Sequence, residues 1–163
     1  MPANAALHAS LALLFAELVH GAAREGAYML NGGDAGLLRS LDALSAEGAS
    51  TPSSPGAASI AAHVDHLCYG LDLMIRWSGG EADPWSGADW AASWRRTAVD
   101  EREWAGLRAR LGDAAGRWQR TLQAPREMSA VEMNGVIGSI AHLAYHLGAI
   151  RQMDRSIQGP KGE

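Results

Sequence analysis

Cysteine, clusters of basic residues and long apolar runs are all scarce in this chain of 163 residues. Cys68 is the only cysteine, so no disulfide can form within the chain, and this fits a reducing compartment. The apolar stretch over residues 7–19 lacks a basic flank, contains Glu17 and is too short to span a bilayer. We therefore expect no membrane segment and no signal peptide, with the cytoplasm as the default location.

Basic residues are also too few for a nucleic-acid partner. The formal net charge is -4, and no run of lysine and arginine is long enough to form a basic face. A protein that neutralises many phosphates needs such a face. We therefore expect no nucleic-acid binding.

Isoleucine, valine and phenylalanine are scarce as well, whereas alanine and leucine supply much of the apolar content. This composition favours helices over strands, and no segment alternates with the two-residue period of a strand. Hydrophobic residues make up 47% of the chain and charged residues 20%, which is typical of a globular protein. The length suits one domain over residues 1–163. The expected fold class is all-α.

Apolar residues at three- and four-residue spacing predict four long helices and one short helix. The predicted long helices cover about 4–24, 57–77, 100–124 and 129–157, and the short one covers 37–44. The third and fourth long helices each begin with a capping box, Asp100 with Glu103 and Ser129 with Glu132. These elements predict a four-helix bundle with short connecting helices, of up-and-down or crossover topology.

Four of the six histidines occur in two close pairs. His142 and His146 are four residues apart, which places them roughly 40° apart around a helix and about 6 Å along it. His63 and His66 are three residues apart on another predicted helix. Neutral imidazoles on facing helices can converge on a divalent cation such as zinc, with nickel, iron or copper as alternatives. We therefore predict that His142, His146 and one histidine of the other pair bind a metal ion.

A structural interpretation of the same histidines stays open. A pair at this spacing also occurs by chance, and buried histidines can form a hydrogen-bonded network in the core without any metal. The metal interpretation is favoured because Leu143, Leu147 and Ile150 make the last helix a core helix, which keeps its histidines near the packed side.

The residues around both pairs resemble a known family. The stretches over 59–67 and 141–152 are similar to the DinB-like superfamily of four-helix-bundle proteins. The resemblance implies a metal held by one histidine of the second long helix and two of the last. Carried over to this sequence, those ligands are His63, His142 and His146. His66 lies on the same helix face as His63, so the choice of the third ligand stays open between these two.

Other candidate residues lie close to the histidines. If His63 is the ligand, His66 is a candidate acid, base or hydrogen-bond donor, and Tyr145 is a candidate for contact with metal-bound water. A structural role for Tyr145 at a helix seam is the alternative. We expect Asp65 to be solvated, and Cys68 to be buried and unreactive.

Two further expectations concern residues outside the histidine pairs. Arg151 lies almost opposite His142 around the helix, so we expect it at the surface or at an interface. Trp77, Trp104 and Trp118 fit helix seams and are expected in the core. The remaining tryptophans surround a connection that could overhang a pocket; they are Trp85, Trp90 and Trp94.

Family members with assigned chemistry include metal-dependent transferases that use low-molecular-weight thiols and a related thiol-dependent isomerase. The resemblance therefore implies a metal-dependent transferase, with a thiol as one substrate, while a metal-bound water would instead give a hydrolase acting on a small molecule. A non-catalytic, stress-associated metal-binding bundle is the alternative. Bundles of this size often pair through an exposed apolar face, so a homodimer is one expected assembly.

Overall fold

A computed structural model describes residues 3–161, and all regular elements in this range are helical. The all-α prediction is confirmed. The longer helices are α1 (Ala3–His20), α4 (Ile60–Ser78), α5 (Glu101–Gln123) and α6 (Ala130–Met153). The shorter elements are α2 (Gly36–Asp42), α3 (Ala46–Ser50) and the 3-10 turns η1 (Ala92–Trp94) and η2 (Arg155–Ile157). Within the described range, no helix combines the length and apolar character needed to cross a bilayer.

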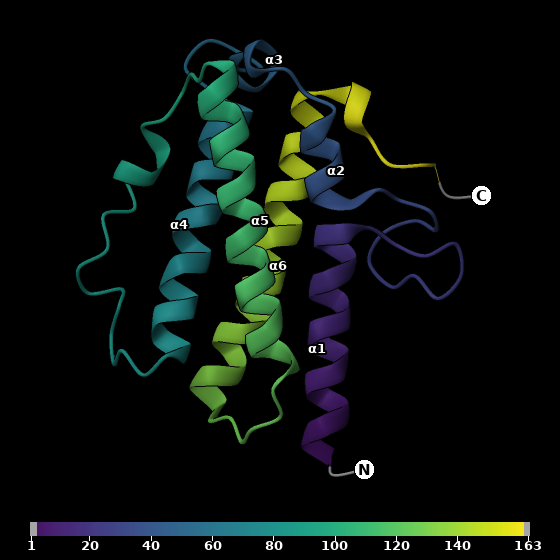
Figure 1. Ribbon diagram of the computed structural model, residues 1–163, viewed down its shortest axis with the longest axis vertical. Helices are drawn as coiled ribbons and strands as arrows, with labels where there is room; N and C mark the ends of the chain where they lie inside the picture. The colour runs from purple at the N-terminus through teal and green to yellow at the C-terminus, as the bar shows by residue number, and fades with distance from the viewer. Residues whose placement is uncertain (1–2, 162–163) are drawn as a thin grey trace.

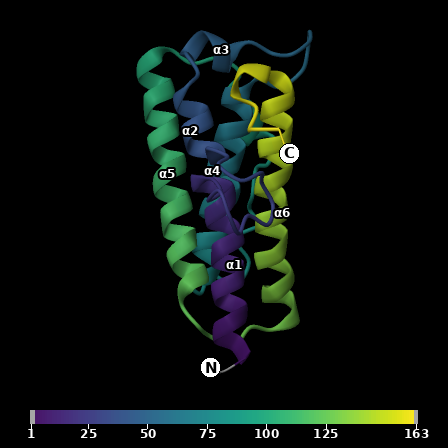
Figure 2. The ribbon, with the colours of Figure 1, turned by 90° about the vertical axis from the view of Figure 1, so that its right-hand side faces the viewer.

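The four long helices lie side by side, as Figures 1 and 2 show. Helix α1 packs against α5 and α6, and both of these pack against α4. Helices α1 and α6 run in one direction, while α4 and α5 run in the other (Figure 1). The parallel pair α4 and α5 is joined by the long connection over residues 79–100, so the chain takes the crossover path.

Side-chain caps set where three of the long helices begin. Ser59 caps α4 by accepting a hydrogen bond from the backbone N–H of Ala62 at 3.2 Å. Both predicted capping boxes are present, at the starts of α5 and α6. Each cap satisfies backbone N–H groups that have no partner inside the helix. The predicted starts at residues 100 and 129 were therefore correct to within one residue.

A single hydrophobic core lies between these helices. Trp104 and Trp118 of α5 are fully buried, as predicted, whereas Trp77 is half-buried and packs against the edge of the core. The indole N–H of Trp104 donates to the carbonyl oxygen of Leu44, and that of Trp118 donates to the hydroxyl of Ser139. These bonds satisfy the polar atoms that the buried rings bring into the core.

Helix α1 ends four residues earlier than predicted, because two glycine backbones meet there. Gly21 and Gly36 both have positive φ, and a Cβ atom built on Gly36 would lie 2.2 Å from the backbone nitrogen of Gly21. The connection that follows folds back onto α1, where the buried Glu17 carboxylate accepts hydrogen bonds from backbone N–H groups at residues 28–30. The apolar spacing up to residue 24 did not reveal this turn.

Arg151 was expected at the surface or at an interface, and the structure places it between α6 and the start of α2 with its side chain only 13% exposed. Its guanidinium forms a bidentate ion pair with Asp34, at 2.8 Å and 2.6 Å, and both side chains are largely buried. Burial by itself raises the pKa of Asp34, but the hydrogen bonds from Arg151 and from the N–H of Gly36 hold it below its ordinary value. The pair joins the end of α6 to the start of α2.

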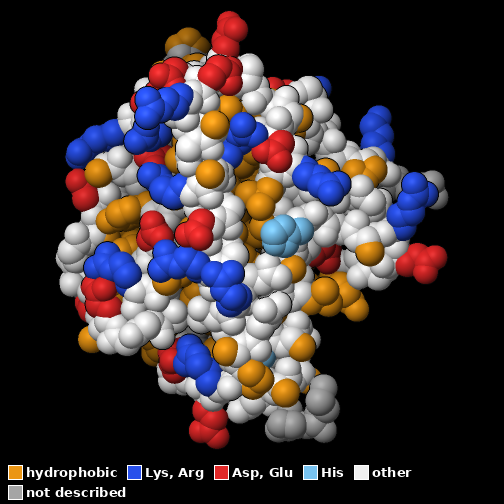
Figure 3. Space-filling view, viewed as in Figure 1, with side chains coloured by type: hydrophobic (Ala, Val, Ile, Leu, Met, Phe, Trp, Pro, Cys, Tyr) orange, Lys and Arg blue, Asp and Glu red, His pale blue; other side chains and the backbone are white. Residues whose placement is uncertain are grey.

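Acidic and basic side chains are interspersed over the face shown in Figure 3. Several of the acidic side chains form ion pairs, and Asp65 pairs with Arg110 and, at 3.3 Å, with Arg96. The side chain of Asp65 is only 16% exposed. The expectation that Asp65 is solvated was therefore wrong, because two arginines from outside α4 cover it.

Candidate metal centre

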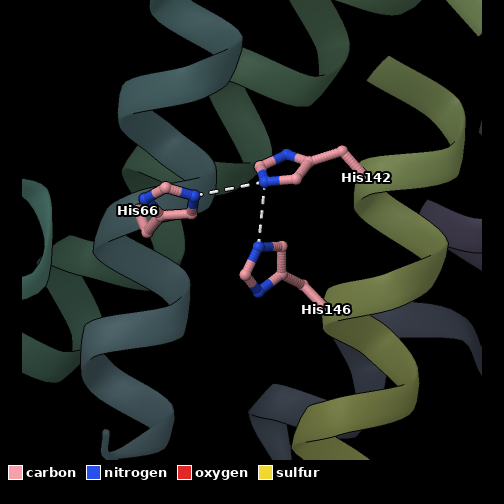
Figure 4. A group of neighbouring side chains, drawn as sticks. All are labelled: His66, His142 and His146. Atoms are coloured by element: carbon pink, nitrogen blue, oxygen red, sulfur yellow. Dashed lines mark hydrogen bonds between the residues drawn. The ribbon is translucent and has the colours of Figure 1, made fainter. Parts of the chain in front are cut away.

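Helices α4 and α6 pack against each other and bring three histidine rings to one point (Figure 4). The Nε2 atom of His142 lies 3.1 Å from Nε2 of His66 and 2.9 Å from Nε2 of His146. Each of the three rings offers one nitrogen to a group whose members all lie within 4.8 Å of one another. The two histidines of α6 reach this point because their four-residue spacing places them on one face.

The spacing of these nitrogens is close to that of a zinc coordination shell. Tetrahedral zinc holds imidazole nitrogens at about 2.0–2.1 Å, which places the ligand atoms about 3.3–3.4 Å from one another. The observed separations of 2.9 Å and 3.1 Å are a few tenths of an ångström shorter. All three ligand atoms lie within 4.8 Å of one another, so the group has the dimensions of a candidate metal site.

The hydrogen bonds of His66 fix where its proton lies. Its Nδ1 atom is 2.8 Å from the hydroxyl oxygen of Ser93, and that hydroxyl donates its own proton to the carbonyl oxygen of Trp90 at 2.7 Å. Because the serine proton is already used, Nδ1–H of His66 donates to Ser93. The Nε2 atom of neutral His66 therefore directs a lone pair into the cluster.

The three converging nitrogens have too few protons to satisfy one another. With a lone pair on Nε2 of His66, its contact with His142 needs a proton on Nε2 of His142. The contact between His142 and His146 also needs one proton, and a second proton in the same small space would meet the first. Neutral rings can thus share a single proton at this point. A cation that accepts all three lone pairs satisfies every nitrogen.

Burial keeps these histidines neutral. It lowers the pKa of His66 to about 4 and that of His146 to about 3, with the neighbouring histidines adding to the effect. Burial also lowers the pKa of His63 and of His142. Near neutral pH the rings are therefore in the form that binds metals.

His63 lies beside the cluster and contacts one of its members. The family resemblance implied His63 as the third ligand, with His66 as the alternative, and the structure places the Nδ1 atom of His63 2.8 Å from Nδ1 of His146, on the side of that ring away from Nε2. Because α4 and α6 are antiparallel, His63 is level with His146, and His66 lies one turn further along, level with His142. This geometry suits His66 as the ligand and His63 as the residue that orients His146.

The connection between α4 and α5 covers the histidines with aromatic rings. Trp94 stacks on His66 with ring centroids 4.2 Å apart and meets His63 edge-on at 5.1 Å. The ring centroid of Trp90 lies 5.5 Å from that of His66. Ser93, which orients His66, belongs to the same connection and was missed by sequence reasoning, since nothing near it in the sequence signals that role.

Two other candidates lie at the edge of the centre or outside it. Tyr145 packs edge-on against His146 at 5.1 Å between centroids, and 69% of its surface is exposed. Cys68 is buried as expected, and burial raises the pKa of its thiol to about 11, although Arg110 acts in the opposite direction. The thiol of Cys68 is therefore protonated near neutral pH and is a poor nucleophile.

A cavity of about 260 Å³ adjoins the centre, with His142 in its wall. Trp85 and Trp90 also line it, which confirms the expectation that this connection overhangs a pocket; Trp94 instead packs on the histidines. Most of the remaining wall is leucine, methionine and glycine from α4 and α6. A small molecule in this cavity would lie next to the metal centre.

No protein-family model matches this chain, and no curated protein or solved structure does either. The similarity of residues 59–67 and 141–152 to the DinB-like superfamily therefore stays a prediction. What the structure itself provides is an all-helical chain in which three histidines converge at a point where a metal ion can bind.

Proposed function

We propose that this chain binds a divalent metal ion, zinc in the first place, through His66, His142 and His146. The observation that carries the proposal is the convergence of three ring nitrogens that can share only one proton. Nickel, iron and copper also accept imidazole ligands, and the donor set alone does not select among them.

The chain's own residues are arranged to keep such a centre open and oriented. Ser93 holds the ring of His66, and His63 holds the ring of His146. In both held rings, Nε2 is directed to the point that the three histidines share. Three neutral protein ligands leave a coordination position for a further molecule. When bound there, a metal ion supplies Lewis acidity and lowers the pKa of a thiol or water that joins it.

We further propose that the chain is a metal-dependent enzyme acting on a small molecule, either a transferase that uses a low-molecular-weight thiol or a hydrolase. The cavity beside His142 supports a small substrate. The thiol version and the DinB-like bundle type rest on the sequence resemblance. The four long helices, with one histidine pair on α4 and the other on α6, are compatible with that type.

A non-catalytic metal-binding protein is the second candidate function. The ring nitrogens of the converging histidines contact only one another, His63 and Ser93, and among the described residues no carboxylate bonds to them. A general base other than histidine is thus missing from the immediate surroundings of the cluster in residues 3–161. This favours storage or sensing of a metal.

Metal content decides whether the centre exists. Protein purified without a nickel column and reconstituted with zinc should retain about one ion per chain after gel filtration. His66→Ala, His142→Ala and His146→Ala should each lose it. His20→Ala is the matched control, because this exposed histidine bonds only to Gln119 and should leave the metal in place. Equal zinc in all five proteins, or none in the wild type, would contradict the proposal.

The third ligand and the reaction are tested on the same material. His63→Ala should keep the ion but bind it roughly 10–100-fold more weakly, as expected for a residue that orients a ligand. Complete loss in His63→Ala with retention in His66→Ala would instead assign His63. Thiol consumption in the presence of an electrophile, abolished by a chelator, supports the transferase. A loaded centre that turns over neither thiols nor esters supports the binding protein.

A further inference from the structure

The cavity beside His142 has a composition that restricts what it can hold. Its walls include three leucines and a methionine from α4 and α6, and two indole rings from the connection that follows α4. No charged side chain lines it among the described residues. Its volume of about 260 Å³ lies just below the range of about 300–1,000 Å³ that is usual for drug-sized ligands, so a single-ring molecule suits it.

The two indoles are held in place by other rings. Trp85 meets Trp77 edge-on at 4.9 Å, and Trp90 meets Tyr69 edge-on at 5.4 Å. Their side chains present apolar and π surfaces to the cavity. Such aromatic walls favour flat or apolar ligand groups.

Glycines keep the cavity open on both helices. A Cβ atom on Gly70 of α4 would lie 3.7 Å from Cε1 of His142, so any longer side chain there would crowd this ring. A Cβ atom on Gly138 of α6 would meet nothing within 4 Å, which means that the wall at this position faces open space. The absence of side chains at both positions leaves room next to the histidine.

His142 contributes an unused donor to this apolar space. The Nδ1 atoms of His66 and His146 bond to Ser93 and His63, but Nδ1 of His142 has no hydrogen-bond partner in residues 3–161. Figure 4 shows that this second nitrogen of His142 is directed away from the other two rings. When Nε2 of His142 is a ligand, Nδ1 carries the proton and can donate to an acceptor.

The wall of the cavity also contains the hydroxyl of Ser139, which is already engaged in hydrogen bonds. Ser139 donates to the carbonyl oxygen of Val136 and accepts from the indole of Trp118. Its proton is therefore not available to a ligand. Nδ1–H of His142 and the indole N–H groups of Trp85 and Trp90 are then the side-chain donors that an occupant of the cavity could use, and the donor of His142 is the one that belongs to the histidine cluster.

We propose that this cavity binds the organic substrate of the metal centre, and that this substrate is a small aromatic or apolar molecule with a carbonyl or carboxylate oxygen. The apolar body lies between the leucines and the two indoles. The oxygen accepts the hydrogen bond from Nδ1–H of His142, which orients this third ligand as Ser93 and His63 orient the others. The inference rests on the proposed metal centre for the orientation of His142, but the apolar cavity does not depend on the metal.

Calorimetric titration of the zinc-loaded full chain with benzamide tests the proposal. Benzamide has both the ring and the acceptor, acetamide lacks the ring, and toluene lacks the acceptor. We expect benzamide to bind at least tenfold more tightly than either. Binding of acetamide as tight as that of benzamide would refute the apolar site, and equally tight binding of toluene would refute the role of Nδ1 of His142.

Gly138→Leu places a side chain in the open space of the cavity, on an exposed helical position that tolerates it. It should weaken benzamide binding at least tenfold without changing zinc content or the melting temperature. Gly148→Leu is the matched control, because it is an exposed glycine of the same helix that does not line the cavity. Equal benzamide affinities of the two variants would overturn the proposal.

Titration of the metal-free chain separates this proposal from the metal centre. If the wild type holds no zinc but benzamide still binds more tightly than acetamide, and Gly138→Leu abolishes the difference, the centre fails and the apolar site stands. If zinc binds and Gly138→Leu has no effect on benzamide, the centre stands and the cavity proposal fails.

Discussion

The proposed metal centre depends on Ser93, a residue that is far from the histidines in sequence but contacts His66 in the fold. Its hydroxyl is committed to the carbonyl of Trp90, and this fixes the proton of His66 on the nitrogen that faces away from the cluster. Helices α4 and α6 place the rings, but this one bond determines which nitrogen of His66 has a free lone pair.

We expect Ser93→Ala to weaken zinc binding by roughly 10–100-fold, because the ring and the proton of His66 are no longer held. Competition with a chromophoric chelator measures this affinity. Ser86→Ala is the control in the same connection, since its hydroxyl bonds to the backbone of Asp83 away from the centre. Unchanged affinity in Ser93→Ala would show that His66 needs no orientation from this serine.

The histidine spacing predicted part of this centre. The four-residue spacing of His142 and His146 places both rings on one face of any helix, and the structure brings both into the cluster. The choice between His63 and His66 was beyond the sequence, because both lie on one face of α4. Which of them is level with Nε2 of His142 depends on the register of two antiparallel helices, and that register is a property of packing.

At the scale of elements, the sequence predicted helices better than their ends. The starts of α5 and α6 follow from capping boxes, which are local signals. The end of α1 depends on contact between Gly21 and Gly36, which are 15 positions apart. Helix α3 was missed, because its five residues, Ala46–Ser50, are too few to show an apolar period.

The glycine contact at the end of α1 gives a prediction with an internal control. Gly21 and Gly26 both have positive φ, but a Cβ atom on Gly21 would lie 2.1 Å from the carbonyl oxygen of Asp34, whereas one on Gly26 would meet nothing within 4 Å. We expect Gly26→Ala to lower the free energy of unfolding by about 1–2 kcal/mol through backbone strain alone. Gly21→Ala should lower it by at least twice as much.

Chemical denaturation followed by circular dichroism measures both variants. Equal losses would show that the backbone around Gly21 relaxes freely and that the contact with residues 34–36 does not define the end of α1. If Gly21→Ala fails to fold, the Gly26→Ala variant still reports the strain component by itself.

For the whole molecule, the buried pair of Asp34 and Arg151 connects the end of α6 to the start of α2. We expect Asp34→Asn to destabilise the protein by about 3–5 kcal/mol at neutral pH, because it leaves the guanidinium of Arg151 buried without its counter-charge. Asp42→Asn is the matched control, since its pair with Arg108 is exposed on the aspartate side and should contribute no more than about 1 kcal/mol.

The effect of Asp34→Asn should depend on pH. The folded pKa of Asp34 lies below its ordinary value of 3.8, so the carboxylate stabilises the fold fully above that value. This stabilisation decreases as the pH falls through the lower folded pKa. The difference in unfolding free energy between the wild type and Asp34→Asn should therefore be constant from pH 7 to about 5 and shrink below about pH 4. A difference that grows on acidification would contradict this assignment.

Because of the crossover path, the histidines and part of the cavity wall belong to different segments of the chain, which can differ in their tolerance of sequence changes. The proposed metal ligands project from α4 and α6, whose backbones are fixed by helical hydrogen bonds, whereas the indoles that line the cavity belong to the segment over residues 79–91. Trp90 also holds Ser93, which orients His66, so changes confined to residues 79–89 are the ones expected to leave Nε2 of His66, His142 and His146 in place. The proposed metal centre and part of the wall of the proposed ligand cavity thus lie on separate segments, and we expect changes over residues 79–89 to alter ligand preference more than metal binding.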